Sequence, residues 1–187
     1  MDKPRIQKLI SELLIAIGEN PSREGLRETP DRVAESYMKL FGGYTTDPQK
    51  LITTFDNEGY NEMVIARDID FYSLCEHHLL PFYGKAHVGY IPDKKIIGLS
   101  KLPRLVEVFS RRLQNQERLT KQIADTLSRV LSPKGVGVVV IAEHFCMKAR
   151  GVEKQNCTVS TSAFTGLFKK SQRTRSEFLT LIKGGGA

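Results

Sequence analysis

Two short stretches, far apart in the sequence, hold most of the histidine and cysteine side chains of this chain. Cys75-Glu76-His77-His78 places a thiol, a carboxylate and two imidazoles in four consecutive residues, and His144-Phe145-Cys146 repeats these ligand types downstream. Together they contain three of the four histidines and two of the three cysteines. Because thiolates favour zinc over magnesium or calcium, we predict that the fold brings both stretches together around one Zn²⁺ ion.

The spacing within the two stretches indicates a three-ligand set. Cys75 and His78 have the C-x2-H spacing that lets two side chains of one turn reach the same ion. We expect residues 136–147 to form a buried strand, in which residues two apart share a face, so His144 and Cys146 would point the same way. Cys75, His78 and Cys146 would then leave the fourth position of zinc open, as in catalytic sites, where the pKa of the bound water falls to about 7.

The same residues also allow other interpretations. Cys146 in an apolar strand is, taken alone, more often a buried thiol. His77 and His144 are candidates for acid–base chemistry beside the metal, whereas a fourth ligand among them would give a closed, structural site. We expect Cys157 to be a small buried residue on the return strand and His87 to be an ordinary surface histidine.

Composition narrows the class of protein. A chain of 187 residues suits one domain with a small appendage, and its net charge of +7 favours an anionic partner. No apolar run reaches the roughly 18 residues that span a membrane, and the N-terminus lacks a secretory pattern, so we expect a cytoplasmic protein without a membrane partner. A zinc-stabilised nucleic-acid module is disfavoured, because a second C-x2-C pair and aromatic residues interleaved with basic ones are absent from the sequence.

Hydrophobic periodicity predicts an N-terminal helical segment over residues 1–43, and we expect the candidate catalytic residues to lie in one domain over residues 44–187. Apolar residues recur at helical spacing from Ile6 to Ile17 and again from Val33 to Phe41. Thr29 is expected to cap the second of these helices.

Beyond this segment, strands come in pairs with helices between them, which indicates the α+β class. We expect residues 44–61 to form a loop with a short helical turn, and Gly184-Gly185-Gly186 to fray. The other predicted elements are strands over 63–75 and 82–91, helices over 102–113 and 119–131, strands over 136–147 and 157–163, and a helix over 173–182.

Four motifs can be compared with known families: Cys75-Glu76-His77-His78, Gly98-Leu99-Ser100-Lys101, Gln116-Glu117-Arg118-Leu119-Thr120, and the run from His144 to Gly151. In residues, order and spacing, this set resembles GTP cyclohydrolase I, with similarity running from about Thr29 to the C-terminal helix. The resemblance implies a zinc hydrolase that converts GTP and water to 7,8-dihydroneopterin triphosphate and formate, the first step of tetrahydrofolate or tetrahydrobiopterin biosynthesis.

The resemblance also implies an architecture. In this tunnelling fold, an antiparallel sheet has helices packed on one face, and the sheets of five subunits join into a barrel. Two such rings stack as a homodecamer whose active sites lie between subunits. The sequence does not reveal a regulatory protein partner.

Catalytic roles follow from the same match. The zinc ligands fall on the trio already derived: Cys75, His78 and Cys146. By resemblance, His144 protonates the purine N7, His77 is a second proton carrier, and Ser100 lies near the ribose ring oxygen.

Substrate-binding roles follow as well. Glu117 would accept hydrogen bonds from N1–H and the N2 amino group of guanine, with Gln116 beside it; without the resemblance, Glu117 is a charge in the first turn of a helix. The matched triphosphate ligands are Lys101, Arg104, Arg150 and, from a neighbouring subunit, Arg32; otherwise each is a solvated basic residue. The bacterial pattern has a lysine three residues after Arg32, where this chain has Glu35, which weakens that contact. A related tunnelling-fold enzyme acting on a pterin or deazapurine is the alternative.

Overall fold

The computed structural model describes residues 1–183, and the chain divides into two compact units, Met1–Gly42 and Gly43–Ala187. The predicted fraying of Gly184-Gly185-Gly186 lies outside the described residues. Within residues 1–183, no helix has both the length and the apolar character needed to cross a membrane.

The first unit is a pair of helices. Helix α1 (Lys3–Ala16) packs against α2 (Thr29–Leu40), and Leu14 and Ala34 are their buried residues. The predicted cap of α2 is wrong, because Thr29 is already the first helical residue and its hydroxyl faces the Gly25 carbonyl at 3.5 Å. The apolar spacing therefore locates both helices but not the residue at which α2 begins.

The second unit is built on a five-stranded sheet with the strand order β5-β2-β3-β6-β7. All neighbours are antiparallel except β2 and β5. Its elements, in chain order, are η1 (Gly42–Thr45), α3 (Pro48–Leu51), β1 (Thr54–Asp56), β2 (Val64–Cys75), β3 (Pro81–Ile91), β4 (Lys95–Ile97), α4 (Lys101–Ser110), β5 (Leu113–Gln114), α5 (Gln116–Leu131), β6 (Gly135–His144), α6 (Phe145–Lys148), β7 (Val159–Phe164), α7 (Gly166–Lys170) and α8 (Gln172–Ile182). The predicted mixture of helices with an antiparallel sheet is confirmed, whereas the small β1–β4 sheet was not predicted.

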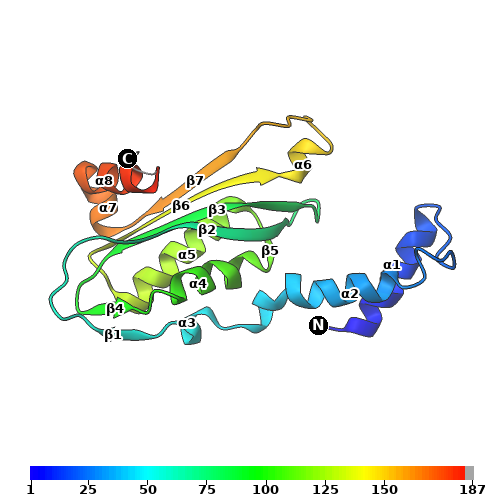
Figure 1. Cartoon of the computed structure of the whole chain (residues 1–187), viewed down its shortest axis with the longest axis horizontal. Coiled ribbons are helices and arrows are strands. Elements are labelled where there is room, and N and C mark those ends of the chain that lie inside the picture. The colour runs from blue at the N-terminus through cyan, green and yellow to red at the C-terminus, as the bar shows by residue number, and fades with distance from the viewer. Residues whose placement is uncertain (184–187) are drawn as a thin grey trace. The chain divides into compact units, whose positions relative to one another are not determined.

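The register of the sheet brings distant residues to one end. Cys75, the last residue of β2, pairs with Gln114 of β5, directly before α5 begins. Phe82 of β3 pairs with His144, the last residue of β6. The β2–β3 turn, the start of α5 and the end of β6 therefore meet at the same end of the sheet (Figure 1).

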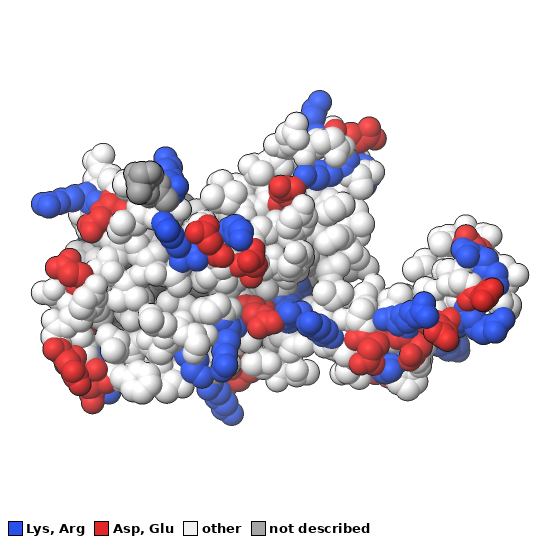
Figure 2. Space-filling model, viewed as in Figure 1, with Lys and Arg blue, Asp and Glu red and all other residues white. Residues whose placement is uncertain are grey.

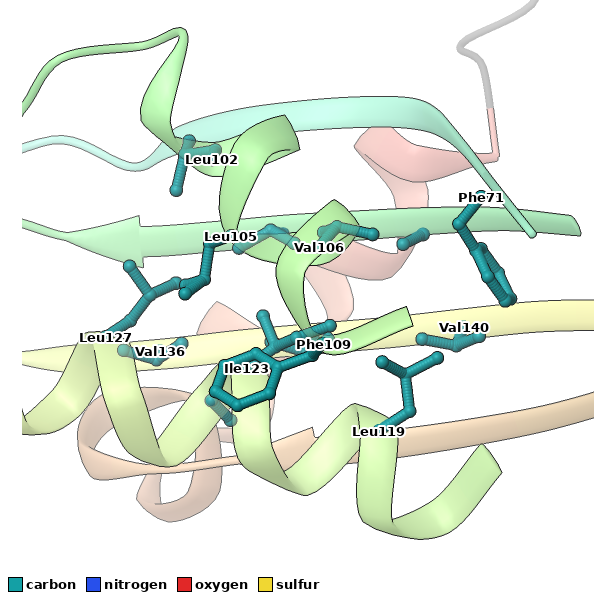
Figure 3. Close-up of a cluster of buried hydrophobic side chains, with 14 of the residues drawn as sticks. Phe71, Leu102, Leu105, Val106, Phe109, Leu119, Ile123, Leu127, Val136 and Val140 are labelled. Carbon is teal, nitrogen blue, oxygen red and sulfur yellow. The ribbon is translucent and has the colours of Figure 1, made fainter. Parts of the chain in front are cut away.

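Helices α4 and α5 cover one face of the sheet and form the main core with it (Figures 1 and 3). Leu105, Leu119 and Ile123 from the helices and Val140 from β6 are completely buried. Full burial of each such side chain contributes roughly 1.5–3 kcal/mol. This apolar layer fixes α5 on the sheet and so fixes the position of its first turn.

The opposite face is covered at its far end by α7 and α8. Phe168 and Phe178 pack there with Val139 of β6 and Ile91 of β3. A Cβ at Gly89 would lie 2.8 Å from the Phe178 ring, so glycine is what permits this close approach. The prediction that helices pack on one face therefore describes α4 and α5 but not α7 and α8.

His87 is buried rather than exposed, so the prediction of a surface histidine is wrong. Its exposed fraction is 4%, and its Nδ1 accepts a hydrogen bond of 3.2 Å from the backbone N–H of Asp68. Asp68 lies in a bulge of β2 and has a φ of 57°. The alternating pattern of β3 correctly places His87 on the face of the sheet opposite Ala86 and Val88. It does not show that this opposite face is itself partly covered.

Two predicted elements end in different places. Leu113 belongs to β5, where it pairs with Leu74, because helix α4 ends at Ser110. Cys157 is half-buried in the loop before β7, because that strand begins at Val159, the partner of Ala142.

Candidate active site

The β2–β3 turn presents the first pair of candidate ligands. The backbone N–H of Cys75 donates to Leu80 O and the N–H of Leu79 donates to Cys75 O, both at 2.8 Å, which closes the turn. Cys75 is buried at the end of β2, whereas His77 and His78 are exposed on the turn. The turn therefore has an anchored thiol at its base and two imidazoles at its tip.

Cys146 lies on a helical turn, not on a strand, which corrects the prediction of a strand over 136–147. The β3–β6 ladder ends at the Phe82–His144 pair, and helix α6 begins with the next residue, Phe145. Strand β3 begins at Pro81, so beyond that pair β6 has almost no partner strand for backbone hydrogen bonds. The chain forms a helical hydrogen bond instead, from the N–H of Ala149 to Phe145 O at 2.9 Å. The argument that His144 and Cys146 share a strand face is therefore wrong, although Cys146 still reaches Cys75.

Cys75, His78 and Cys146 form a group with the geometry of a metal centre. One ligand atom from each lies within 4.8 Å of the others, and Cys75 Sγ is 3.9 Å from His78 Nδ1. Tetrahedral zinc bonded to two sulfurs and one nitrogen holds these atoms roughly 3.5–3.8 Å apart. Burial, followed by the nearby Cys75, raises the pKa of the Cys146 thiol. A bound cation would act in the opposite direction, because its charge stabilises the thiolate. The donor set and spacing fit zinc.

His144 is fixed beside this group by two contacts. Its ring stacks on Phe82, with centroids 4.6 Å apart and an interplanar angle of 3°. Its Nε2 lies 2.8 Å from Oε1 of Gln116. Burial lowers the pKa of His144, while the charge of Glu117 opposes that shift.

The first turn of α5 carries Gln116 and Glu117. Asn115 caps the helix by accepting a hydrogen bond of 2.8 Å from the N–H of Arg118. Glu117 is exposed, whereas Gln116 has an exposed fraction of 2%. The Gln116 amide is engaged with the protein, and its contact with guanine beside Glu117 stays a prediction.

Glu76 and Arg118 connect the β2–β3 turn to α5. The Glu76 carboxylate accepts hydrogen bonds from Arg118 and, at 2.9 Å, from Nδ2 of Asn115. Arg118 also donates to Gln114 Oε1 at 2.9 Å. Sequence reasoning overlooked Arg118, whose only signal was its place in the Gln116–Thr120 motif.

A cavity of about 230 Å³ joins these groups. Its lining comprises Cys75, His77, His78, Gln114, Asn115, Gln116, Glu117, His144, Cys146, Met147 and Val159. The structure therefore brings together the three candidate ligands, both candidate proton carriers and the candidate guanine-binding carboxylate. Arg150 lies at its edge, with Nη1 2.9 Å from His78 Nε2.

Four predicted site residues lie elsewhere. Ser100, Lys101 and Arg104 belong to the start of α4 and do not line this cavity. Ser100 and Arg104 are exposed. Arg32 belongs to the N-terminal unit, where its guanidinium is 2.6 Å from Glu28.

Glu35, which stands where the bacterial pattern has a lysine, forms an ion pair between the two N-terminal helices. The Glu35 carboxylate accepts a hydrogen bond of 2.7 Å from Nζ of Lys3 in α1. Lys3 also lies 3.2 Å from Asp31, so acidic side chains on α2 pair with a base on α1.

Residues 6–183 match the family model of GTP cyclohydrolase I. The chain is 60% identical to GTP cyclohydrolase 1 of Chlorobaculum tepidum over 92% of this chain and 78% of that protein. It is 56% identical to the Campylobacter lari protein of the same name over 95% and 94% of the two chains, and 58% identical to the Leptospira biflexa one over 96% and 99%. The chain therefore belongs to the GTP cyclohydrolase I family and is an enzyme of that type.

Proposed function

We propose that this enzyme uses zinc to convert GTP and water to 7,8-dihydroneopterin triphosphate and formate. The observation that carries the proposal is one cavity in which the Cys75-His78-Cys146 group, His144 and Glu117 meet. Net hydrolysis consumes one water, releases purine C8 as formate, and retains the ribose carbons in the new pterin ring and its side chain.

The zinc ligands in this proposal are Cys75, His78 and Cys146. Bound zinc supplies Lewis acidity that makes water a nucleophile near neutral pH, which attack on C8 requires. Coordination through His78 Nδ1 would leave a proton on Nε2, which could then no longer accept the hydrogen bond from Arg150. Arg150 would thereby be released toward the triphosphate.

His144 is the proposed acid for N7 of the purine. Protonation at N7 draws electrons from C8 and so favours nucleophilic attack there. His144 is held by Phe82 and Gln116 at the wall of the cavity, which suits a group that must deliver a proton to one atom. His77, exposed on the facing turn, is the proposed second proton carrier.

Glu117 is the proposed guanine-binding residue. A carboxylate can accept paired hydrogen bonds from N1–H and the N2 amino group, and adenine offers neither donor in that arrangement. Glu117 lines the cavity, and no ion pair to Glu117 is found within residues 1–183. Its acceptor capacity is thus available to a ligand.

In this proposal, the triphosphate and the ribose bind at a site shared between subunits of a tunnelling-fold homodecamer. A cavity of about 230 Å³ is smaller than the roughly 300 Å³ at which small-molecule pockets begin. Ser100, Lys101 and Arg104 lie outside it in their own chain, so in this proposal they reach the site of an adjacent copy. Arg32 is the further phosphate contact from a neighbouring subunit.

The positive net charge fits a triphosphate ligand better than nucleic acid. On the face shown in Figure 2, basic and acidic side chains are interspersed, without the continuous basic stripe that a nucleic-acid backbone requires. Along the sequence, too, the basic residues are spread over the chain and form no single run.

The test is a formate assay on purified protein given GTP, with and without a zinc chelator. We expect formate and, after oxidation, a fluorescent pterin in equal amounts, with both lost on chelation and restored by Zn²⁺. Bound GTP without formate would contradict the proposed reaction, and unchanged turnover after complete metal removal would contradict the proposed cofactor.

A further inference from the structure

Gln116 is a buried glutamine whose whole amide group is engaged. Its Nε2 lies 3.0 Å from Val140 O, 2.9 Å from Val159 O and 3.1 Å from Thr161 Oγ1. Its Oε1 lies 2.8 Å from Nε2 of His144. Two backbone carbonyls on one side and an imidazole on the other therefore surround it.

The orientation of this amide follows from its partners. Backbone carbonyl oxygens only accept hydrogen bonds, so the side facing Val140 and Val159 must be the NH₂ group. Rotating the amide by 180° would place its oxygen against two carbonyl oxygens and remove both hydrogen bonds, which is unfavourable. Oε1 therefore faces His144.

A neighbouring hydroxyl pair agrees with this orientation. Thr120 Oγ1 donates to Gln116 O at 2.7 Å, so its one hydrogen is used there. In the 2.6 Å contact between the hydroxyls of Thr120 and Thr161, Thr161 must then donate. Thr161 Oγ1 consequently has a lone pair, not a hydrogen, toward Gln116 Nε2.

The amide orientation determines which ring nitrogen of His144 carries a proton. Because Oε1 of Gln116 can only accept, Nε2 of His144 must donate, whatever the charge of the ring. A 180° flip of the ring would keep the stack on Phe82 but would place a C–H in place of Nε2, so the contact with Gln116 is what fixes the ring orientation. Nδ1 of His144 makes no hydrogen bond to any residue from 1 to 183 and is left for a ligand in the cavity.

We infer that Gln116 is the positioning residue for His144: it holds the proton on Nε2 and leaves Nδ1 as the nitrogen that exchanges a proton with the substrate. This inference rests on the proposed role of His144 in GTP hydrolysis. It replaces the predicted guanine contact of Gln116, because a side chain that binds Val140, Val159 and His144 has no hydrogen left for the purine.

The direct test is nitrogen-15 magic-angle-spinning NMR of histidine-labelled, zinc-loaded protein at a pH where His144 is neutral. With four histidines in the chain, the His144 signal is identified by its loss in His144→Ala. We expect protonated Nε2 and bare Nδ1 in the wild type, and a mixture of both tautomers in Gln116→Leu. A wild type with protonated Nδ1, or a Gln116→Leu spectrum identical to it, would overturn the inference. The wild-type spectrum decides the first point even if Gln116→Leu does not fold.

Kinetics separate positioning from guanine binding. We expect Gln116→Leu to lower kcat roughly 10- to 100-fold while KM for GTP changes by less than about threefold. A raised KM with unchanged kcat would instead make Gln116 a substrate contact. Thr161→Val is the matched control, since it alters the same buried network but leaves the His144 contact; it should keep the wild-type tautomer. A wild type that releases no formate would refute the proposed function, whereas the NMR result stands independently.

Discussion

The Glu76 carboxylate and the Arg118 guanidinium form an ion pair that ties the turn carrying Cys75 and His78 to the first turn of α5. The Arg118 hydrogen bond lowers the pKa of Glu76, so the carboxylate is charged at neutral pH. Asn115, the cap of α5, completes the connection. One acidic residue thus connects the candidate metal ligands to the turn of α5 that carries Glu117.

Removal of this charge should loosen the metal centre without removing a ligand. We expect Glu76→Gln to weaken zinc binding roughly 10- to 100-fold, as with other residues that orient metal ligands. Competition with a chromogenic chelator measures the affinity. Asp70→Asn is the control, because Asp70 forms an exposed ion pair with Lys85 on the sheet and should leave zinc affinity unchanged. Equal zinc affinity in Glu76→Gln and the wild type would show that the charge of Glu76 is not needed to position the ligands.

The two cysteines outside the β2–β3 turn should respond differently to substitution. Cys146→Ser removes one of three ligands, and we expect loss of both stoichiometric zinc and turnover. Cys157→Ser should keep both, because Cys157 is absent from the metal group. Metal content by atomic emission and formate release measure the two outcomes. Full zinc in Cys146→Ser would remove Cys146 from the ligand set.

His87 should make stability depend on pH. Burial lowers its pKa in the folded protein, with Arg67 and Lys85 acting in the same direction and Asp68 opposing. The unfolded state therefore binds a proton at a higher pH than the folded state, near the ordinary value of about 6.5. Its contribution is complete above that pH and is lost as pH falls through the folded-state pKa, with a slope of at most about 1.4 kcal/mol per pH unit.

The comparison is with His87→Asn, whose side chain can still accept the hydrogen bond from Asp68 but does not titrate. We expect the wild type to lose more free energy of unfolding than His87→Asn between pH 7 and pH 5, measured by denaturant titration. Parallel pH profiles for the two proteins would contradict this expectation.

Helices and strands of the sheet unit followed from periodicity because their apolar faces contact one another directly. The buried face of α5, with Leu119 and Ile123, shows the helical spacing that the core demands. The Cys75-His78-Cys146 group was also predictable, since the C-x2-H spacing is local and few other cysteines and histidines occur in the sequence. Cys146 shows the limit: its place on a helical turn depends on where β3 begins, which residues near Cys146 do not encode.

Long-range hydrogen bonds account for most of what was missed. Arg118 and Gln116 form contacts with Glu76 and His144 that depend on the pairing of β5 with β2 and on the packing of α5. In the sequence, both look like ordinary polar residues at a helix start. The cover that α7 and α8 provide likewise determines the burial near His87 and is invisible in the pattern of β3 alone.

Glu117 should determine which purine the enzyme accepts. In Glu117→Gln, one carboxylate oxygen that could accept from guanine becomes an NH₂ group facing its donors. We expect kcat/KM for GTP to fall about 10- to 100-fold, the effect of one charged hydrogen bond. Inosine triphosphate lacks the N2 amino group, so the wild type should strongly prefer GTP to it, and the variant should prefer GTP much less. Asp125→Asn, which changes an exposed carboxylate paired with Lys121 on the same helix, should keep the wild-type preference. An unchanged ratio of the two substrates in Glu117→Gln would place guanine recognition on other residues.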